Sequence, residues 1–382
     1  MIATRRRLLA GLSASAVAGP ALAQGAPATT GLKLTPAQVA AGRAFLARHP
    51  SVDVHAHPGV FFLRDYAGAN ATAKAMGPPF EAKVLAAMAQ GHVTAALFNC
   101  VADAALLERT PAGGLAPARE FQPGEAWAEY RRQIGLLHAM VARHEVAPGR
   151  NVADITAAQA ARKVAAVFAV EGGDFIENRM ERVHAAYGDG VRAITIIHYH
   201  PNQIGDPQTS APRFPGLTDV GRDVVREMNR AGIIVDLAHA SFGVVRDAVG
   251  ISTRPMMLSH TNLKRPDLDH PRLVSVEHAR LVTEHGGIVG SWPSGIGHKT
   301  MADWIDSILR LVDALGVDHV AIGTDMDANY LPVFGDYADW PLIPAALLAR
   351  GLHEAEVAKI MGGNFLRLLG GRETVKPDRA KI

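Results

Sequence analysis

The sequence predicts an α/β fold, a (β/α)8 TIM-type barrel, because short apolar runs alternate with amphipathic segments along the chain. The runs are rich in β-branched residues and nearly continuously apolar, which is typical of parallel strands covered on both faces. Polar or ionisable residues follow most of them. The eight expected strands are residues 52–55, 93–101, 164–171, 191–198, 233–239, 256–260, 287–292 and 320–325. A doubly wound open sheet is the alternative fold.

Helical patterns fill most of the gaps between these strands. A first helix is expected after Thr35, which suits an N-cap, with Pro36 in its first turn. Residues 126–144, 219–230 and 301–315 repeat apolar residues at helical spacing. Gly232 and Gly316 are the expected C-caps of the last two. Residues 68–79 and 202–216 are rich in Gly, Pro, Asn and Asp and are expected to be loops that either roof the strand ends or lie plainly on the surface.

Composition bounds the class of protein. The chain has 382 residues, 48% of them hydrophobic and 20% charged, which is the profile of a soluble globular protein. Its single cysteine, Cys100, excludes an intrachain disulfide and a cysteine-rich zinc site. A metal would therefore have to be held by histidines and carboxylates.

The amino terminus has the anatomy of a cleaved export signal. Three arginines at positions 5–7 precede a short apolar run that ends in Ala21-Leu22-Ala23, and the start resembles a twin-arginine signal. We therefore expect residues 1–23 to be a signal peptide, 24–33 a linker, 34–372 a single barrel domain and 373–382 a tail, in a periplasmic or secreted protein. A membrane anchor or an amphipathic tail is the alternative, although the apolar run is too short for a span.

Removal of residues 1–23 would also remove the excess of positive charge. It takes away three arginines and no acids, which leaves 36 Lys and Arg against 37 Asp and Glu. The mature chain is thus near neutral, and nothing in its charge favours a nucleic acid or an anionic membrane as partner.

Six of the expected strands end in residues that can bind a metal or move a proton. The carboxyl ends of barrel strands converge on one face. Unpaired ionisable groups buried there would cost several kcal/mol each unless a metal neutralised them. Imidazole and carboxylate ligands suit zinc, and a carboxylate can bridge two ions. The residues are His55 and His57, Glu171 before two glycines that favour a bridging role, His198, His239, His260 and Asp325.

Sequence motifs around these residues resemble the membrane (renal) dipeptidase family of zinc peptidases, within the amidohydrolase-like barrels. The resemblance runs from about residue 52 to residue 370. It rests on Val170–Gly173, His198–Asp206, Val235–Ser241, Ser259–Asn262, His270–Arg272, Gly323–Asp327 and Gly362–Arg367.

The resemblance implies a role for each residue. His55 and His57 would bind one zinc ion, His239 and His260 a second, and Glu171 would bridge the two. Asp325 would orient and deprotonate a water between the ions to give a metal-bridging hydroxide. His198 would stabilise the oxyanion of the tetrahedral intermediate, Arg272 would bind the terminal carboxylate of the substrate, and Asn202 would assist in substrate binding. A homodimer is a further family expectation.

The chain departs from the family pattern in three places. Position 57 is His where the family has Asp, so the site carries about one more positive charge. The segment between His260 and Arg272 has one extra residue, and Leu273 stands where the family has Asn, so Arg265 is an alternative to Arg272. Ala328 replaces a family glycine. His200 is likewise an alternative to His198.

The sequence therefore predicts an exported binuclear zinc dipeptidase that acts on a small peptide. A related amidohydrolase that cleaves acyl-amino acids, lactams or lactones is one alternative. A catalytically silent metal-binding protein is another, but a purely structural metal site has no need of a base such as Asp325.

Overall fold

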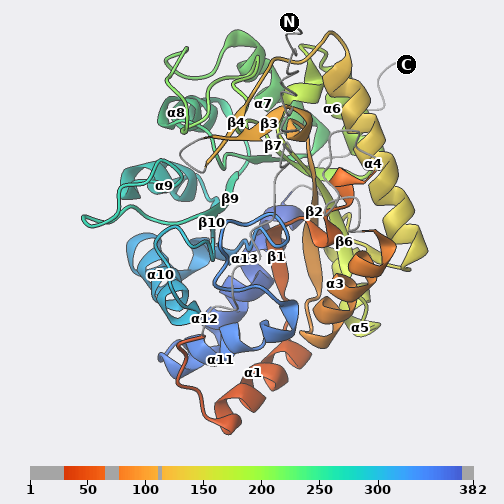
Figure 1. Cartoon of the computed structure of the whole chain (residues 1–382). Helices are drawn as coiled ribbons and strands as arrows, with labels where there is room; N and C mark the ends of the chain where they lie inside the picture. Colours follow the sequence, from red (N-terminus) through yellow and green to blue (C-terminus); the bar gives the residue numbers. More distant parts are fainter. Residues whose placement is uncertain (1–29, 65–76, 111–113, 372–382) are drawn as a thin grey trace, which may run out of the picture.

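A closed barrel of parallel strands surrounded by helices forms the body of the molecule (Figure 1). The computed structural model describes residues 30–64, 77–110 and 114–371. Eight strands follow the predicted positions: β1 (Val52–Ala56), β2 (Ala95–Val101), β6 (Ala165–Glu171), β7 (Val191–Thr195), β8 (Ile234–Asp236), β9 (Met257–Thr261), β10 (Ile288–Ser291) and β11 (Val320–Ile322). The expected signal peptide, the tail and most of the linker and of loop 68–79 lie outside the described residues.

The barrel is closed by the pairing of β2 with β6. The two strands stay in parallel register from Ala95 opposite Ala165 to Val101 opposite Glu171. The barrel strands pair consecutively in the order β2-β1-β11-β10-β9-β8-β7-β6, and short β5 (Ala147–Pro148) pairs with β6. The predicted (β/α)8 barrel is confirmed, and this closure excludes the open doubly wound sheet.

Helices cover the outside of the barrel. The expected first helix is confirmed: the Thr35 hydroxyl accepts from the Gln38 N–H, and Gln38 Oε1 accepts from the Thr35 N–H. Gly232 ends another helix with φ 80, as expected of a C-cap. The helices are α1 (Pro36–Arg48), α3 (Pro78–Gln90), α4 (Glu125–Arg143), α5 (Val152–Ala160), α6 (Glu181–Gly188), α7 (Asp219–Ala231), α8 (Phe242–Ile251), α9 (Val276–Glu284), α10 (Met301–Leu315), α11 (Leu342–Ala349), α12 (Glu354–Ala358) and α13 (Asn364–Gly370).

Shorter elements lie in the connections between the barrel strands and the helices. A small hairpin of β3 (Leu107–Arg109) and β4 (Leu115–Pro117) rises after β2. Single helical turns lie at Pro58–Leu63, Ala104–Leu106, Asp174–Ile176, Val317–His319, Tyr337–Asp339 and Lys359–Gly363.

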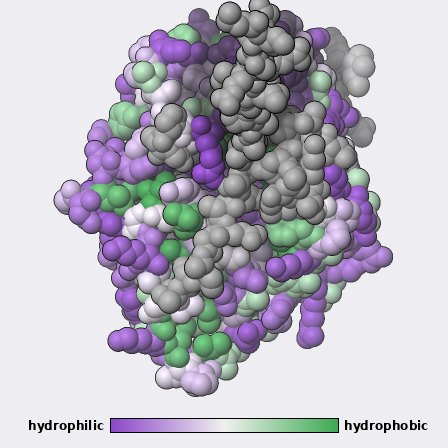
Figure 2. Space-filling view, in the orientation of Figure 1, coloured by the Kyte–Doolittle hydropathy of each residue, from purple (hydrophilic) through white to green (hydrophobic). Residues whose placement is uncertain are grey.

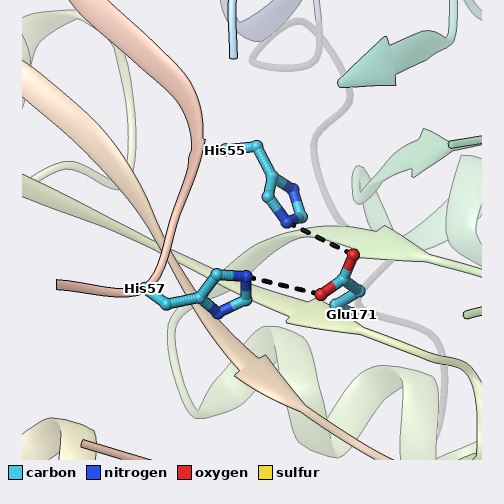
Figure 3. A group of neighbouring side chains, drawn as sticks. All are labelled: His55, His57 and Glu171. Carbon is cyan, nitrogen blue, oxygen red and sulfur yellow. Dashed lines mark ion pairs between the residues drawn. The ribbon is translucent and has the colours of Figure 1, made fainter. Parts of the chain in front are cut away.

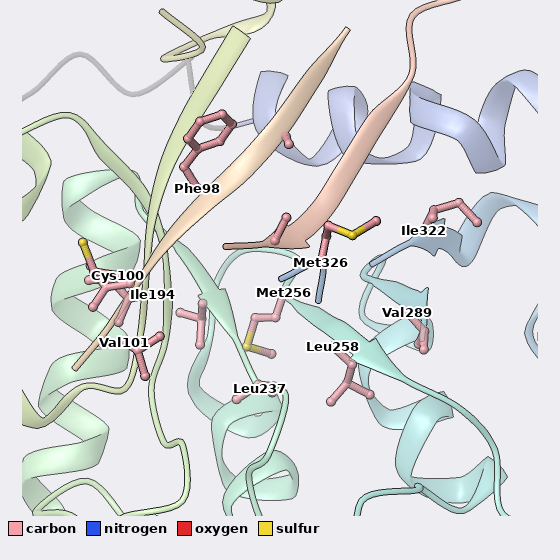
Figure 4. Close-up of a cluster of buried hydrophobic side chains, with 14 of the residues drawn as sticks. Phe98, Cys100, Val101, Ile194, Leu237, Met256, Leu258, Val289, Ile322 and Met326 are labelled. Carbon is pink, nitrogen blue, oxygen red and sulfur yellow. The ribbon is translucent and has the colours of Figure 1, made fainter. Parts of the chain in front are cut away.

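Two apolar clusters hold the barrel and its helices together. The larger one lies between strands and helices, and Figure 4 shows part of it, including Phe98, Ile194 and Leu258. The smaller one takes residues from every barrel strand and therefore fills the barrel interior, joined by Phe365 of α13 and Ile155 of α5. Burial of these side chains provides the main driving force for folding, at about 25 cal/mol per Å² of apolar surface. Polar residues lie at or just beyond the carboxyl ends of the strands.

The outer surface carries few large apolar side chains. The face in Figure 2 is mostly hydrophilic, with hydrophobic residues in small groups. Within the described ranges, no helix combines the length and the apolar character that crossing a membrane requires. The exposed large hydrophobic residues are Tyr187, Phe214, Phe242, Val276, Tyr330 and Leu331.

Candidate metal centre

The predicted metal ligands meet at the carboxyl end of the barrel, around Glu171. This carboxylate ends β6 and lies opposite His55 and His57 of the first strand segment (Figure 3). Its Oε1 is 3.3 Å from His55 Nε2, and its Oε2 is 3.4 Å from His57 Nε2. All three side chains are buried. Together they form a group whose ligand atoms lie within 4.8 Å of one another.

A second group of the same size shares the same carboxylate. Glu171 Oε1 is 3.1 Å from His239 Nε2 and 3.5 Å from His260 Nε2. The Nε2 atoms of the two histidines are 3.0 Å apart. The ligand atoms of this group also lie within 4.8 Å of one another. Glu171 is therefore the residue that joins two potential metal positions.

Irregularities in β1 and β9 change the direction in which His55 and His260 point. Between Asp53 and Ala56, β1 advances three residues while β2 advances two, so β1 carries an extra residue next to His55. A similar shift occurs in β9 next to His260. In a regular strand His55 and His57 would lie on the same face, but β1 ends at Ala56 and is irregular. Both histidines nevertheless reach Glu171, because the bulge re-aims the side chain.

Hydrogen bonds at Nδ1 hold three of the imidazoles with Nε2 directed toward Glu171. The Ser259 hydroxyl lies 3.1 Å from His55 Nδ1 and 3.0 Å from His260 Nδ1. His57 Nδ1 lies 3.2 Å from the carbonyl oxygen of Asn99. Within the part of the chain that the structure describes, His55 Nε2 and His57 Nε2 are buried and make no hydrogen bond. His239 differs, because its buried Nδ1 has no hydrogen-bond partner among the described residues. The four imidazoles and the carboxylate are nevertheless a donor set that fits zinc.

The electrostatics of the cluster favour ligands in their metal-binding forms. Burial raises the pKa of Glu171, but the nearby His198 and His55 imidazoles outweigh it and hold that pKa well below its usual range. Burial lowers the pKa of His239 and of His260 well below the ordinary value for histidine. A carboxylate anion and neutral imidazoles are the forms that bind metal ions.

The pKa of His57 shifts in the opposite direction to those of His239 and His260. Burial opposes a charge on its ring, but the carboxylates of Asp325 and Glu171 raise its pKa to about 10. Its Nε2 is 3.3 Å from Asp325 Oδ1. A metal ion that binds here would have to displace a proton from His57, a requirement that the aspartate of the family pattern would not impose.

Two of the site residues adopt a backbone conformation that is costly for any residue other than glycine. His239 has φ 66 and Asp325 has φ 55. Strain of this kind costs on the order of 1–3 kcal/mol and persists where the surrounding structure demands it. The Asp325 N–H donates to the His55 carbonyl oxygen over 2.8 Å, so the strained turn is tied to β1.

Asp103 is a site residue whose role the sequence left unclear. It follows β2, is fully buried, and its Oδ1 is 2.6 Å from His198 Nδ1. Burial lowers the pKa of His198, but Asp103 and Glu171 outweigh burial and raise it. His198 Nε2 in turn lies 3.5 Å from Glu171 Oε2. Asp103 therefore orients His198 toward the centre, and its position after the second strand was the available signal.

The two arginine candidates lie in different surroundings. Arg272 is only 3% exposed, and among the described residues none of its guanidinium nitrogens has a hydrogen-bond partner. Its Cζ lies 5.0 Å from the centre of the Trp292 ring, and Trp292 also contacts the His260 ring. Arg265 instead pairs with Asp267 over 3.1 Å at the surface. Arg272 is thus the buried cation that lacks a counter-ion.

The structure does not direct Asn202 toward the centre. Its amide nitrogen donates to the Ile196 carbonyl oxygen over 3.0 Å, and its amide oxygen accepts from the Ile204 N–H over 2.9 Å. These contacts use the side chain to hold the loop after β7, and a role of Asn202 in substrate binding stays a prediction.

His200, the alternative to His198, points away from Glu171. Its Nδ1 lies 2.6 Å from Asp174 Oδ1, and its Nε2 lies 2.9 Å from Glu120 Oε2. Burial lowers the pKa of His200, but the two carboxylates outweigh it and raise the pKa to about 9. His200 is therefore an ion-paired residue of the surrounding loops.

Comparisons with known proteins agree on one family. A family model described as membrane dipeptidase (peptidase family M19) matches residues 39–381. Dipeptidase verJ of Clonostachys rogersoniana is 29% identical over 253 residues, which cover 64% of this chain and 65% of that protein. Dipeptidase tcpJ of Claviceps purpurea is 35% identical over 223 residues, which cover 56% of this chain and 52% of that protein. The matched stretches thus span between half and two thirds of these relatives.

Solved structures share the fold over nearly their whole length. A metallopeptidase from Rhodobacter sphaeroides, liganded with a phosphinate mimic of the dipeptide L-Ala-D-Ala, has a TM-score of 0.70 at 21% identity, covering 84% of this chain and 98% of that one. The probable dipeptidase PvdM from Pseudomonas aeruginosa has a TM-score of 0.72 at 18% identity, covering 89% of this chain and 99% of that one. At these identities the likeness shows the fold alone.

Proposed function

The chain belongs to the membrane dipeptidase family of peptidases, and from this premise we propose that it hydrolyses the amide bond of dipeptides with two bound zinc ions. The observation that carries the proposal is the single carboxylate, Glu171, shared by two groups of histidines. A structural zinc site closes with four ligands around one ion. A shared carboxylate with two histidines on each side instead suits a pair of ions with open positions.

The proposed ligands divide as the two groups do. His55 and His57 would hold one ion, His239 and His260 would hold the other, and Glu171 would serve as a ligand in both groups. When bound, the two ions would supply Lewis acidity that polarises the amide carbonyl and activates a shared water as the nucleophile.

The remaining residues handle protons and charge. Asp325 accepts the proton of the attacking water and passes it to the leaving amine as the C–N bond breaks. His198, held by Asp103, donates a hydrogen bond to the oxyanion that forms on the carbonyl oxygen. Arg272 pairs with the terminal carboxylate of the substrate, because it is a buried guanidinium with no counter-ion of its own.

The relatives support a dipeptide as the substrate class. Two of them carry the name dipeptidase, and a metallopeptidase of the same fold binds a mimic of L-Ala-D-Ala. Export by the twin-arginine route, with cleavage after residue 23 and a periplasmic location, is part of the proposal. Amino-terminal sequencing of the protein recovered from the periplasm of an expressing bacterium tests that part.

The decisive experiment is an assay of zinc-reconstituted protein against dipeptides with free and with amidated carboxyl ends. We expect the free dipeptides to be hydrolysed much faster than the amides, and loss of turnover in Asp325→Asn with zinc content unchanged. Equal cleavage of the amides would favour a broader amidohydrolase. Turnover that persists in Asp325→Asn would rule out the mechanism, and absence of turnover in the wild type would favour a silent metal-binding protein.

A further inference from the structure

Tyr199 follows His198 and stands beside the proposed carboxylate site, but neither the sequence motifs nor the relatives give it a role. We infer that Tyr199 is a specificity-determining residue whose hydroxyl donates a hydrogen bond to the terminal carboxylate of the substrate, together with Arg272. This inference rests on the proposed dipeptidase function and assigns a residue that selects its substrate.

The first support is the position of the phenol ring over the centre. The Tyr199 ring meets the His239 ring edge-on, with centroids 5.0 Å apart, and the His198 ring with centroids 4.6 Å apart. Its backbone N–H donates to Asp103 Oδ2 over 3.2 Å. The same carboxylate that orients His198 therefore also fixes the start of the Tyr199 side chain. The ring is half-buried, so it can still meet a small ligand.

The second support is the set of charges around the phenol. The Tyr199 hydroxyl lies close to the Arg272 guanidinium, and Asp325 and Glu171 are within electrostatic reach of it. The phenol therefore lies near the cation of Arg272 and the carboxylates of the centre. A protonated phenol is a hydrogen-bond donor.

The third support is the free edge of Arg272. The Trp292 ring covers one face of the guanidinium, 5.0 Å from Cζ. The three nitrogens at its edge are buried and make no hydrogen bond of normal geometry within the described residues, although they come close to the Tyr199 hydroxyl. A phenol oxygen that accepts from a guanidinium still has its own O–H to donate. The two groups can therefore donate together to one further acceptor.

A carboxylate satisfies this requirement better than a carbonyl oxygen does. It offers about four lone-pair positions on two oxygens, enough for a bidentate guanidinium and one hydroxyl. Its negative charge also compensates the buried cation, which a neutral amide oxygen would not. The geometry therefore favours the terminal carboxylate of the substrate over the scissile carbonyl as the partner of Tyr199.

The test compares Tyr199→Phe with wild type, using alanyl-alanine and its carboxyl-terminal amide. Removing a hydrogen bond to a charged group should raise KM for the free dipeptide roughly 10- to 100-fold, with the loss falling on KM rather than on kcat. Activity toward the amide should not change. A fall in kcat at constant KM would place the hydroxyl at the oxyanion instead and would overturn the inference, as would unchanged constants.

A matched control and a binding measurement separate this inference from the proposed function. Tyr187→Phe removes a hydroxyl from an exposed tyrosine on α6 and should leave KM at the wild-type value. Calorimetric titration of alanyl-alanine into zinc-loaded Asp325→Asn, with and without Tyr199→Phe, needs no turnover. A weaker affinity in the double variant supports the role of Tyr199 even if the wild type fails to hydrolyse dipeptides. Equal affinities refute it.

Discussion

Replacing Arg272 with methionine should make the protein more stable and, at the same time, a much poorer enzyme. The guanidinium is 3% exposed and bonds to no described residue, so folding removes a charge from water without pairing it. It also lowers the pKa of His239 by repulsion. A buried guanidinium without a partner does not stabilise the fold. We therefore attribute the presence of Arg272 to a ligand that binds it in the folded protein.

The size of the stability change follows from two opposing contributions. Leaving buried polar groups without partners costs about 1–3 kcal/mol, and more for a charge. The cation–π contact with Trp292 offsets this cost by about 0.5–2 kcal/mol. A methionine at position 272 would keep part of that stabilisation through its own contact with the ring. We therefore expect Arg272→Met to raise the free energy of unfolding by about 1–2 kcal/mol.

The expected loss of function is larger than this gain in stability. A hydrogen-bonded charge pair with the substrate, once removed, typically costs about 2–5 kcal/mol. At 1.4 kcal/mol for each factor of ten, kcat/KM for a free dipeptide should fall at least about 30-fold. The amidated dipeptide, which lacks the carboxylate, should lose little further activity.

Urea unfolding of the metal-free proteins and steady-state kinetics of the zinc forms measure both effects. Arg265→Met is the matched control, because Arg265 pairs with Asp267 at the surface and should change either quantity little. The reasoning is refuted if Arg272→Met destabilises the protein and still prefers the free dipeptide as strongly as wild type does. It is also refuted if Arg265→Met shows the larger loss of activity.

Three further changes test the neighbours of the centre. Asp103→Asn removes the carboxylate that orients His198, so kcat should fall roughly 10- to 100-fold with zinc content unchanged, by kinetics and metal analysis. Because the folded pKa of His200, about 9, exceeds the ordinary 6.5, its ion pairs add stability that is complete below about pH 6.5 and lost as the pH rises through 9. The gap in unfolding free energy between wild type and His200→Gln should therefore close over that range, and a constant gap would contradict this assignment. His57→Asp should hold zinc more tightly against a chelator and move the acid limb of the pH–rate profile to higher pH, whereas identical retention and profiles would show that position 57 does not tune the metal.

Much of the fold could be predicted because it depends on local patterns. Each barrel strand is a short apolar run, and α1 begins at a residue pair, Thr35 and Pro36, whose preferences act within one turn. The bulges next to His55 and His260 could not be predicted. They arise from pairing between strands far apart in the sequence, and no local pattern marks the extra residue.

The candidate site was predictable where a side chain ends a strand. Glu171 ends β6, and His55, His239, His260 and Asp325 lie within three residues of the carboxyl end of a strand, so the barrel brings them together. The supporting residues were harder to find because their role depends on a partner from another strand. Ser259 is one example, since its hydroxyl lies between two histidines contributed by different strands.

Asn202 is harder to interpret from sequence. The family resemblance implied that it assists in substrate binding, and in the structure its amide bonds to the backbone of its own loop. Sequence alone cannot distinguish an asparagine that binds a ligand from one that holds a turn, because both lie in loops with the same neighbours.

The most direct test of the account is the metal content of the protein after zinc reconstitution and dialysis, measured by mass spectrometry for wild type and for Glu171→Gln. The shared carboxylate predicts two zinc ions per chain in wild type and a marked loss from both positions in the variant. A wild-type protein that saturates at one ion, or a Glu171→Gln variant that retains two, would contradict it.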